Sequence, residues 1–331
     1  MKSLVTQSVL VRKCNSAYFR YRRNRWRWSP KFKATANVKI DRPIYLLGTQ
    51  GGGLTLLSRI LHRHRASISV TGDHHNWAGD DETQNVLQAI LPERLGWRRV
   101  DVPGFDSADH NWLYANDAFL PHYRERGFQD EAQLAADYKT VLRRIIALNG
   151  AQETGATRFI DKSQSLTVRV GLVRRLLTGC NPKFVLITRD PTALTWRAVT
   201  HDRIISGLKC SQEEKFELAV QHWANSFQAA LEDREDDLKI WKFEDLLADP
   251  PQVIEEICQH VELAYDPAIL PGPNDEVPWG SAFDAFNKRK WYPMRPNVSS
   301  GYLEDMPSWA KAHLNERAGE LIHKLGYQTH V

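Results

Sequence analysis

The chain has 331 residues, of which 42% are hydrophobic and 25% are charged, with a formal net charge of +4. These values are ordinary for a globular protein with a hydrophobic core. No apolar run approaches the roughly 20 residues needed to span a bilayer. The four cysteines are widely spaced and form no CxxC pair, which disfavours a thiol-ligated zinc site and a disulfide framework. We therefore expect reduced cysteines and a cytoplasmic protein.

The first 40 residues differ in charge from the rest of the chain. Residues 1–40 contain eleven Lys or Arg and no Asp or Glu, which leaves 33 basic and 40 acidic residues in the remainder. Aromatic residues alternate with arginines between Tyr18 and Trp28. We expect a flexible basic arm that contacts an anionic surface, such as lipid head groups or nucleic acid. A poorly ordered tail and an organelle transit peptide are the alternatives.

Residues 41–331 are predicted to form one α/β domain in which strands alternate with helices. The expected strands are 44–47, 158–161, 183–188 and 238–243, and the expected helices are 54–61, 132–148, 165–177, 213–232, 251–261 and 309–325, with another beginning at Pro191. This alternation predicts a doubly wound parallel sheet flanked by helices. Residues 97–130 are rich in aromatic residues without clear periodicity, which predicts a long surface insertion, typical of functional lids.

A glycine-rich loop separates the first strand from the first helix. Its residues are Gly48, Thr49, Gln50, Gly51, Gly52, Gly53, Leu54 and Thr55. Glycines allow successive N–H groups to face one cavity, and a helix N-terminus favours an anion. The spacing matches the triphosphate loop G-x-x-x-x-G-K-[ST], except that Leu54 stands in place of the lysine. The loop therefore favours phosphate binding over kinase or NTPase chemistry, and a simple strand-to-helix turn is the alternative.

Further segments follow the loop in a recognisable order. They are Phe159–Lys162, Phe184–Pro191, Trp241–Pro250, Met294–Pro307 and Leu325–Tyr327. Together with the loop, which is similar to the pattern G-x-x-[KR]-[ST]-G-T-T-L-L, they resemble the sulfotransferase family over residues 43–327. The tyrosylprotein-type and related bacterial enzymes are the most similar members. The resemblance implies a P-loop-like fold, in-line sulfuryl transfer without a metal, and the donor 3′-phosphoadenosine 5′-phosphosulfate (PAPS). It also implies a hydroxyl acceptor, which could be a sugar, a phenol or a tyrosine.

The resemblance also suggests which residues act at the reacting end of the donor. Gly51 stands where the family has Lys or Arg, so the loop needs a cation from elsewhere. Lys162 is the first candidate, and Arg59 is another. For the base that accepts the acceptor's proton we nominate Asp73 and His75, with His74 behind them. Adjacent residues of an extended segment point apart, so this acidic and histidine-containing run does not predict a metal site.

A second set of residues is expected at the 3′-phosphate. Arg189 belongs to the segment that contacts this group in the family. Arg197 stands where the family usually has serine, and arginine can bind phosphate through two hydrogen bonds. Arg295 and Ser299 are expected to close over the nucleotide. Two competing functions remain open: a P-loop kinase or NTPase, and a catalytically weak nucleotide-binding interaction protein.

The basic arm yields a prediction that can be tested directly. Deletion of residues 1–39 should abolish partitioning of the protein to anionic vesicles, because those residues carry the excess positive charge. Co-sedimentation with vesicles containing phosphatidylserine measures this, and neutral vesicles are the control. Unchanged partitioning after the deletion would reject the surface-contact role.

Overall fold

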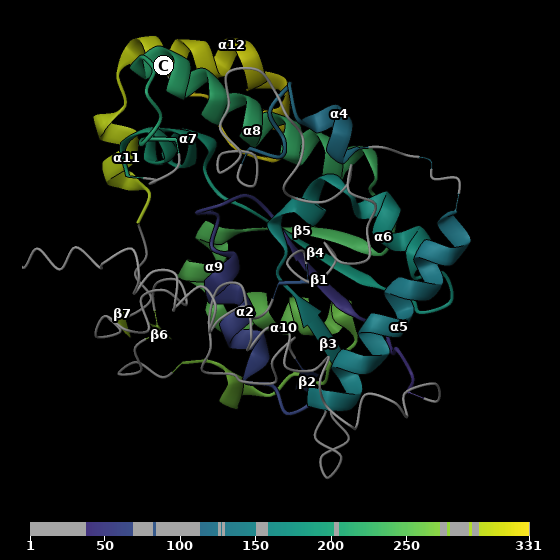
Figure 1. The fold of residues 1–331 in the computed structure, drawn as a ribbon. Coiled ribbons are helices and arrows are strands. Elements are labelled where there is room, and N and C mark those ends of the chain that lie inside the picture. Colours follow the sequence, from purple (N-terminus) through teal and green to yellow (C-terminus); the bar gives the residue numbers. More distant parts are fainter. Residues whose placement is uncertain are drawn as a thin grey trace, which may run out of the picture.

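The computed structural model describes residues 38–68, 82–83, 113–124, 127, 130–149, 158–201, 205–271, 277–278, 291–292 and 298–330. A five-stranded parallel sheet forms the centre of this part of the chain (Figure 1), in the order β2-β3-β1-β4-β5. The strands are β1 (Ile44–Leu47), β2 (Ser67–Ile68), β3 (Arg158–Asp161), β4 (Lys183–Thr188) and β5 (Leu238–Lys242). The predicted doubly wound parallel sheet is confirmed. The two-residue strand β2 was not predicted, because it is too short to show a periodic pattern.

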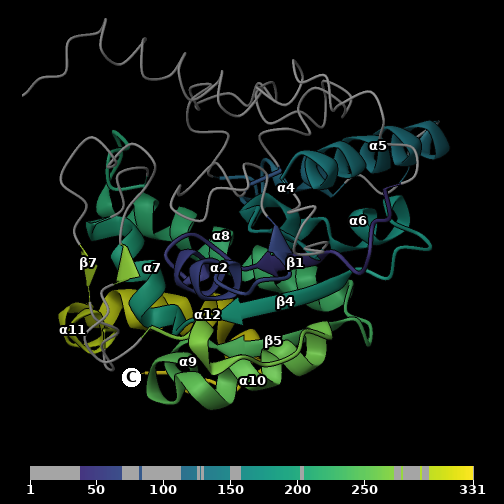
Figure 2. The ribbon, with the colours of Figure 1, turned by 90° about the horizontal axis from the view of Figure 1, so that it is seen from below.

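The sheet separates two hydrophobic cores, and alternate residues of each strand face opposite cores. Ile44 and Leu46 of β1 pack against α2 (Leu54–His62), α9 (Phe243–Ala248) and α10 (Pro250–Val261). Tyr45 and Leu47 face the other core. That core is covered by α5 (Glu131–Asn149), η4 (Gln164–Val168), α6 (Val170–Leu176), α7 (Pro191–Thr200), α8 (Gln212–Glu232) and α12 (Ser308–Lys324). Figure 2 shows α9 and α10 beside β5. Because both faces are covered, the central strands are continuous apolar runs.

Local capping residues fix the starts of several helices. Asp190 precedes α7 and accepts a hydrogen bond from the Ala193 N–H at 3.0 Å, and Pro191 opens the helix. Ser211 and Glu214 form a capping box at the start of α8. The helix expected over 165–177 is instead divided into η4 and α6, because Arg169 leaves helical geometry with φ −130° and ψ 23°.

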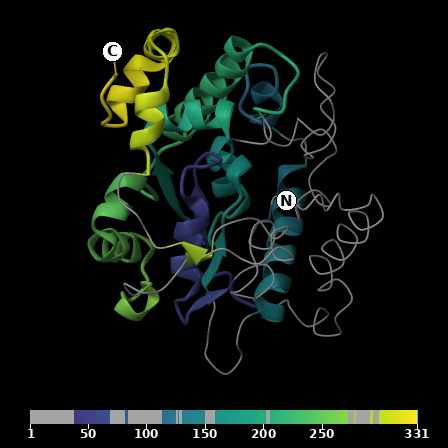
Figure 3. The same ribbon diagram turned by 90° about the vertical axis from the view of Figure 1, so that its left-hand side faces the viewer.

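The remaining elements lie toward the C-terminal part of the chain. They are η5 (Pro267–Ile269), the antiparallel pair β6 (Val277–Pro278) and β7 (Trp291–Tyr292), and α11 (Ser300–Asp305). In Figure 3 the yellow helices α11 and α12 lie beside the green helices α7 and α8, and direct contacts join α11 to α7 and α12 to α8. The C-terminal segment is therefore packed against the elements that follow β4.

Residues 113–124 of the expected insertion contain both exposed and buried positions. Leu113, Tyr114, Phe119 and Tyr123 are each no more than 2% exposed and belong to the larger core. The short helix α4 (Leu120–Tyr123) ends this segment. The aromatic side chains of residues 113–124 pack in the core. Hydrophobic periodicity could not reveal their burial, because the segment is mostly irregular. The rest of the predicted insertion, apart from 127 and 130, lies outside the described residues.

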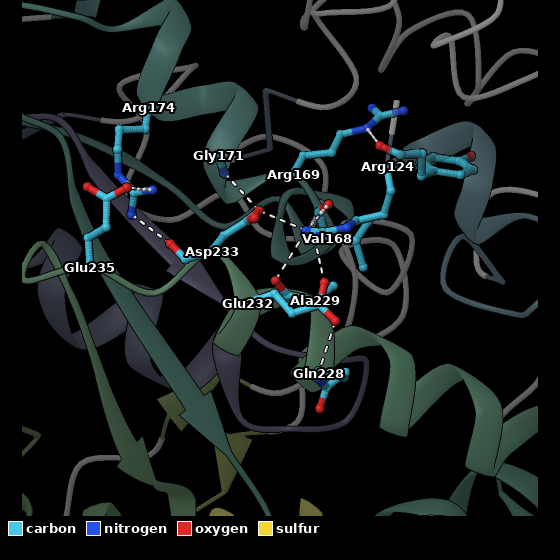
Figure 4. Close-up of polar contacts among 11 residues, drawn as sticks. Arg124, Val168, Arg169, Gly171, Arg174, Gln228, Ala229, Glu232, Asp233 and Glu235 are labelled. Carbon is cyan, nitrogen blue, oxygen red and sulfur yellow. Dashed lines mark hydrogen bonds and ion pairs between the residues drawn. The ribbon is translucent and has the colours of Figure 1, made fainter. Parts of the chain in front are cut away.

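Arg124 attaches this segment to the core (Figure 4). Its guanidinium donates hydrogen bonds to Asp233 at 2.8 Å, Glu232 at 2.8 Å and the carbonyl of Ala229 at 3.2 Å. The Asp233 carboxylate also accepts from the Gly171 N–H at 3.0 Å, so it joins α6 to the same guanidinium. One half-buried ion pair therefore connects α4, α6 and the end of α8.

Arg124→Met should lower the free energy of unfolding by about 2–3 kcal/mol, because it removes the cationic partner of a half-buried carboxylate and one hydrogen bond to a backbone carbonyl. Arg175→Met is the matched control. Arg175 pairs with Glu131 on the surface, where an ion pair contributes about 0–1 kcal/mol. Urea unfolding of both variants measures the difference, and equal effects would contradict the anchoring role of Arg124.

Candidate functional site

The connections of the sheet diverge between β1 and β4. From β1 the chain continues through α2 to β2 on one side, and from β4 it continues through α7 and α8 to β5 on the other. In open parallel sheets, a crevice for ligands forms where neighbouring strands send their connections in opposite directions. The glycine-rich loop follows β1 and Arg189 follows β4, so the topology places both at this point.

The glycine-rich loop has the backbone geometry of an anion site. Gly51 and Gly53 have φ values of +78° and +95°, which residues other than glycine rarely adopt. Gly53 is the N-cap of the nine-residue helix α2, and neither a capping side chain nor an acidic first-turn residue occupies that end. The first N–H groups of α2 and the positive end of its dipole are therefore available to an anion.

A residue that sequence reasoning missed holds the start of the loop. The Thr167 hydroxyl in η4 accepts from the Gly48 N–H at 2.8 Å and donates to the Gly48 carbonyl at 3.1 Å. The partners are 119 positions apart, so no local pattern could have predicted the contact. Within the described chain, the buried Thr49 hydroxyl has no hydrogen-bond partner, which leaves one polar group of the loop unused.

Phe243 closes the loop against Arg189. A Cβ on Gly53 would overlap the Phe243 ring. Any larger residue at this position would therefore clash with that ring and would also have to adopt an unfavourable positive φ. The Arg189 guanidinium lies over the same ring, 5.4 Å from its centroid. The ring of Phe243, the residue directly after β5, thus sets the spacing between the loop and Arg189.

Arg189 is buried at the crevice with its guanidinium held on several sides. It donates to the Gly51 carbonyl at 2.9 Å, the Ser299 hydroxyl at 3.1 Å and the Val298 carbonyl at 3.3 Å. Burial, and next the nearby positive charge of Arg197, lower the pKa of Arg189 from its ordinary value. The structure therefore brings together three residues expected at the site, Arg189, Ser299 and Gly51.

The Glu244 carboxylate links this cluster to the C-terminal segment. It accepts hydrogen bonds from the Asp190 N–H at 3.0 Å, the Tyr327 hydroxyl at 3.0 Å and the Ser299 hydroxyl at 3.4 Å. Burial, and next the Glu244 charge, raise the pKa of Tyr327, so its hydroxyl stays protonated as a donor. Glu244 lies in a segment that carried the family resemblance, but its role as a structural acceptor was not predicted.

Lys162 stands at the same edge of the sheet, at the end of β3, and is 1% exposed. Its ammonium donates to Glu82 at 2.6 Å. Neighbouring Asp161 accepts from the hydroxyl and backbone N–H of Thr83, which brings residues 82 and 83 back onto β3. Glu82 was not singled out from the sequence, since nothing local distinguishes it from other acidic residues. Arg59, the second cation suggested for the loop, is 7% exposed on α2.

Arg197 lies beside the loop as well. A Cβ on Gly51 would lie 2.5 Å from Nη1 of Arg197, so the guanidinium fills the space next to this glycine. The hydroxyls of Thr195 and Thr200 donate to carbonyls of their own helix, at 2.8 Å and 2.9 Å. Four expected site residues, Asp73, His74, His75 and Arg295, lie outside the described residues and stay predictions.

Comparison with known proteins now decides the family. A family model described as "Sulfotransferase family" matches residues 43–267, which include every element of the sheet. The chain belongs to the sulfotransferase family. The sequence has no significant match among curated proteins. Membership supports sulfuryl transfer as the general activity of this sulfotransferase.

Solved structures agree on the fold at low sequence identity. A sulfotransferase domain from the curacin biosynthetic pathway is 16% identical, with a TM-score of 0.51, over 88% of this chain and 100% of that one. A domain from the Synechococcus PCC 7002 olefin synthase is 18% identical, with a TM-score of 0.50, over 89% and 98%. A Mycobacterium avium sulfotransferase is 14% identical, with a TM-score of 0.50, over 95% and 81%. The predicted sulfotransferase fold is therefore confirmed.

Two absences hold for the part of the chain that the structure describes. None of its helices is long and apolar enough to cross a membrane. No group of three or more His, Cys, Asp or Glu in that part is arranged to hold a metal ion.

The Glu244 contacts predict a specific loss of stability. Glu244→Ala should lower the free energy of unfolding by about 2–4 kcal/mol, because three donors at the crevice lose their acceptor. Asp245→Ala is the matched control, since this exposed neighbour should change stability by less than about 0.5 kcal/mol. Equilibrium urea unfolding measures both, and indistinguishable midpoints would refute the linking role of Glu244.

Proposed function

We propose that this sulfotransferase moves a sulfuryl group from PAPS to a hydroxyl-bearing acceptor by in-line transfer. The observation that carries the proposal is the meeting of the glycine-rich loop with Arg189 between β1 and β4. An uncapped helix N-terminus, two glycines with positive φ and a buried unpartnered Thr49 hydroxyl all fit a phosphate-like group. PAPS carries such a group at each end of its ribose.

The two ends of the donor are assigned to different residues. The loop from Gly48 to Thr55 would hold the 5′-phosphosulfate, and Lys162 would stabilise charge that develops on the leaving phosphate during transfer. Arg189 and Ser299, which are hydrogen-bonded to one another, would bind the 3′-phosphate. Arg295 would cover the nucleotide from the segment preceding Ser299.

The base must take the proton from the acceptor hydroxyl. Asp73, His75 and His74 remain the candidates drawn from the sequence. Glu82 joins them, because it is the carboxylate that contacts Lys162 at the carboxyl edge of the sheet. Its carboxylate and the Lys162 ammonium would neutralise one another until the substrates enter.

The acceptor class and the cellular setting are further parts of the proposal. We propose a sugar, phenol or tyrosine hydroxyl, since residues 97–130 are rich in both aromatic and polar side chains. A cytoplasmic location and contact of residues 1–40 with an anionic surface complete the proposal. The arm itself lies almost wholly outside the described residues.

A transfer assay with donor carrying radiolabelled sulfate and mixed hydroxyl acceptors tests the activity. We expect labelled product from the full chain and a 10²- to 10³-fold slower reaction with Lys162→Ala, the cost typical of removing one transition-state donor. Lys183→Ala is the control, because this lysine pairs with Glu262 at the opposite edge of the sheet.

Two outcomes would overturn the proposal. Tight binding of adenosine 3′,5′-bisphosphate without transfer to any acceptor would identify a nucleotide-binding interaction protein. Phosphate release or transfer from ATP and Mg²⁺ would restore the kinase or NTPase alternative. Comparing Glu82→Gln, Asp73→Asn, His74→Gln and His75→Gln in the same assay assigns the base, since only loss of the base should remove the fall in rate at low pH that protonation of the base causes.

A further inference from the structure

Two arginines flank the same glycine of the loop. Arg189, which directly follows β4, donates a hydrogen bond to the Gly51 carbonyl at 2.9 Å. Arg197 approaches from α7, with Nη1 2.5 Å and Cζ 3.4 Å from the position of a Cβ on Gly51. The absence of a side chain at position 51 is therefore what admits the second guanidinium.

The two guanidinium groups differ in how they are held. Arg189 is buried and bonded to three protein acceptors. Arg197 is half-buried, and among the residues that the structure describes no acceptor hydrogen-bonds to its guanidinium. Arg197 also lies near enough to Arg189 for their charges to repel. Like charges destabilise one another, and an anion bound to either guanidinium offsets that repulsion.

The loop itself carries no positive side chain. Residues 48–55 contain neither Lys nor Arg, so backbone N–H groups and the α2 dipole are its own contribution to an anion. Lys162, the first cation expected there, is already paired with Glu82. Arg197 is the cation whose guanidinium touches the loop and whose donors stay available.

We propose that Arg197, from α7, supplies the loop's missing cation and binds the 5′-phosphosulfate end of the donor, with Arg189 and Ser299 left to the 3′-phosphate. This inference rests on the proposed function. It changes the role expected for Arg197 from the sequence, which was binding of the 3′-phosphate. Gly51 and Arg197 act as one unit, in which the glycine provides the space and the arginine provides the charge. Arg197 offers a planar pair of donors that fits an oxyanion with two hydrogen bonds, which lysine cannot reproduce.

Three adenine nucleotides can distinguish binding of the donor's 5′ group from binding of its 3′ group. Adenosine 5′-phosphosulfate carries only the 5′ group, adenosine 3′-monophosphate only the 3′ group, and adenosine 3′,5′-bisphosphate carries a phosphate at both positions. Titration calorimetry with the full chain would give the affinity for each. Arg197→Ala should weaken binding of the two 5′-bearing ligands by about 10- to 100-fold. Binding of the 3′-monophosphate should change by less than about twofold.

A reciprocal variant and a conservative one complete the design. Ser299→Ala should weaken the 3′-bearing ligands and leave adenosine 5′-phosphosulfate unchanged. Arg197→Lys should recover part of the lost 5′ affinity, because charge returns without the planar donor pair. Thermal unfolding of each variant checks that it is folded. If Arg197→Ala is not folded, Arg197→Gln replaces it.

The outcomes distinguish this inference from the proposed function. If the unaltered chain binds none of the three ligands, both fail. If it binds adenosine 3′,5′-bisphosphate but Arg197→Ala weakens the 3′-monophosphate equally or more, the proposed function stands and the 5′ role of Arg197 is rejected. No change in any affinity on Arg197→Ala rejects that role as well.

Discussion

The parallel pairing of β1 with β4 is the constraint on which the candidate site depends. Because the two strands run in the same direction, the segments that follow them emerge at one edge of the sheet. Because their connections then leave to opposite sides, this edge is the point of the sheet at which open parallel folds bind ligands. A glycine-rich loop and a buried arginine that are far apart in sequence thereby become hydrogen-bonded neighbours. Phe243, at the end of the adjacent strand β5, fixes their separation by packing on both.

The strands and most helices could be predicted because their determinants are local. Apolar runs such as Ile44–Leu47 and caps such as Asp190 and Ser211 are visible within a few residues, and the structure has those elements at the expected positions. The break at Arg169 was missed, since the residues on both sides keep helical apolar spacing. Burial of the segment around Tyr114 was missed for a different reason: irregular segments have no period that distinguishes an inner from an outer face.

The candidate site was only partly predictable, because its decisive contacts are long-range. The loop and Arg189 could be found from motifs, and Ser299 from its place near the C-terminal motif. The contacts of Thr167 with Gly48 and of Glu82 with Lys162 join residues that are 119 and 80 positions apart, so no spacing rule applies to them. Arg197 shows a third situation. Its position in the sequence suggested phosphate binding, but only the structure relates its guanidinium to the bare backbone at Gly51.

Glu244 has a consequence for how the C-terminal segment is attached to the candidate site. One carboxylate accepts from the residue after Arg189, from Ser299 and from Tyr327, which follows the last helix. The hydrogen bonds of Arg189 and Ser299 are therefore part of the same network that holds Tyr327 after α12. By thermodynamic linkage, any coupling between this network and a ligand at Arg189 acts with the same free energy in both directions. Residues 298–330 therefore belong to the hydrogen-bonded frame that holds Arg189 in place.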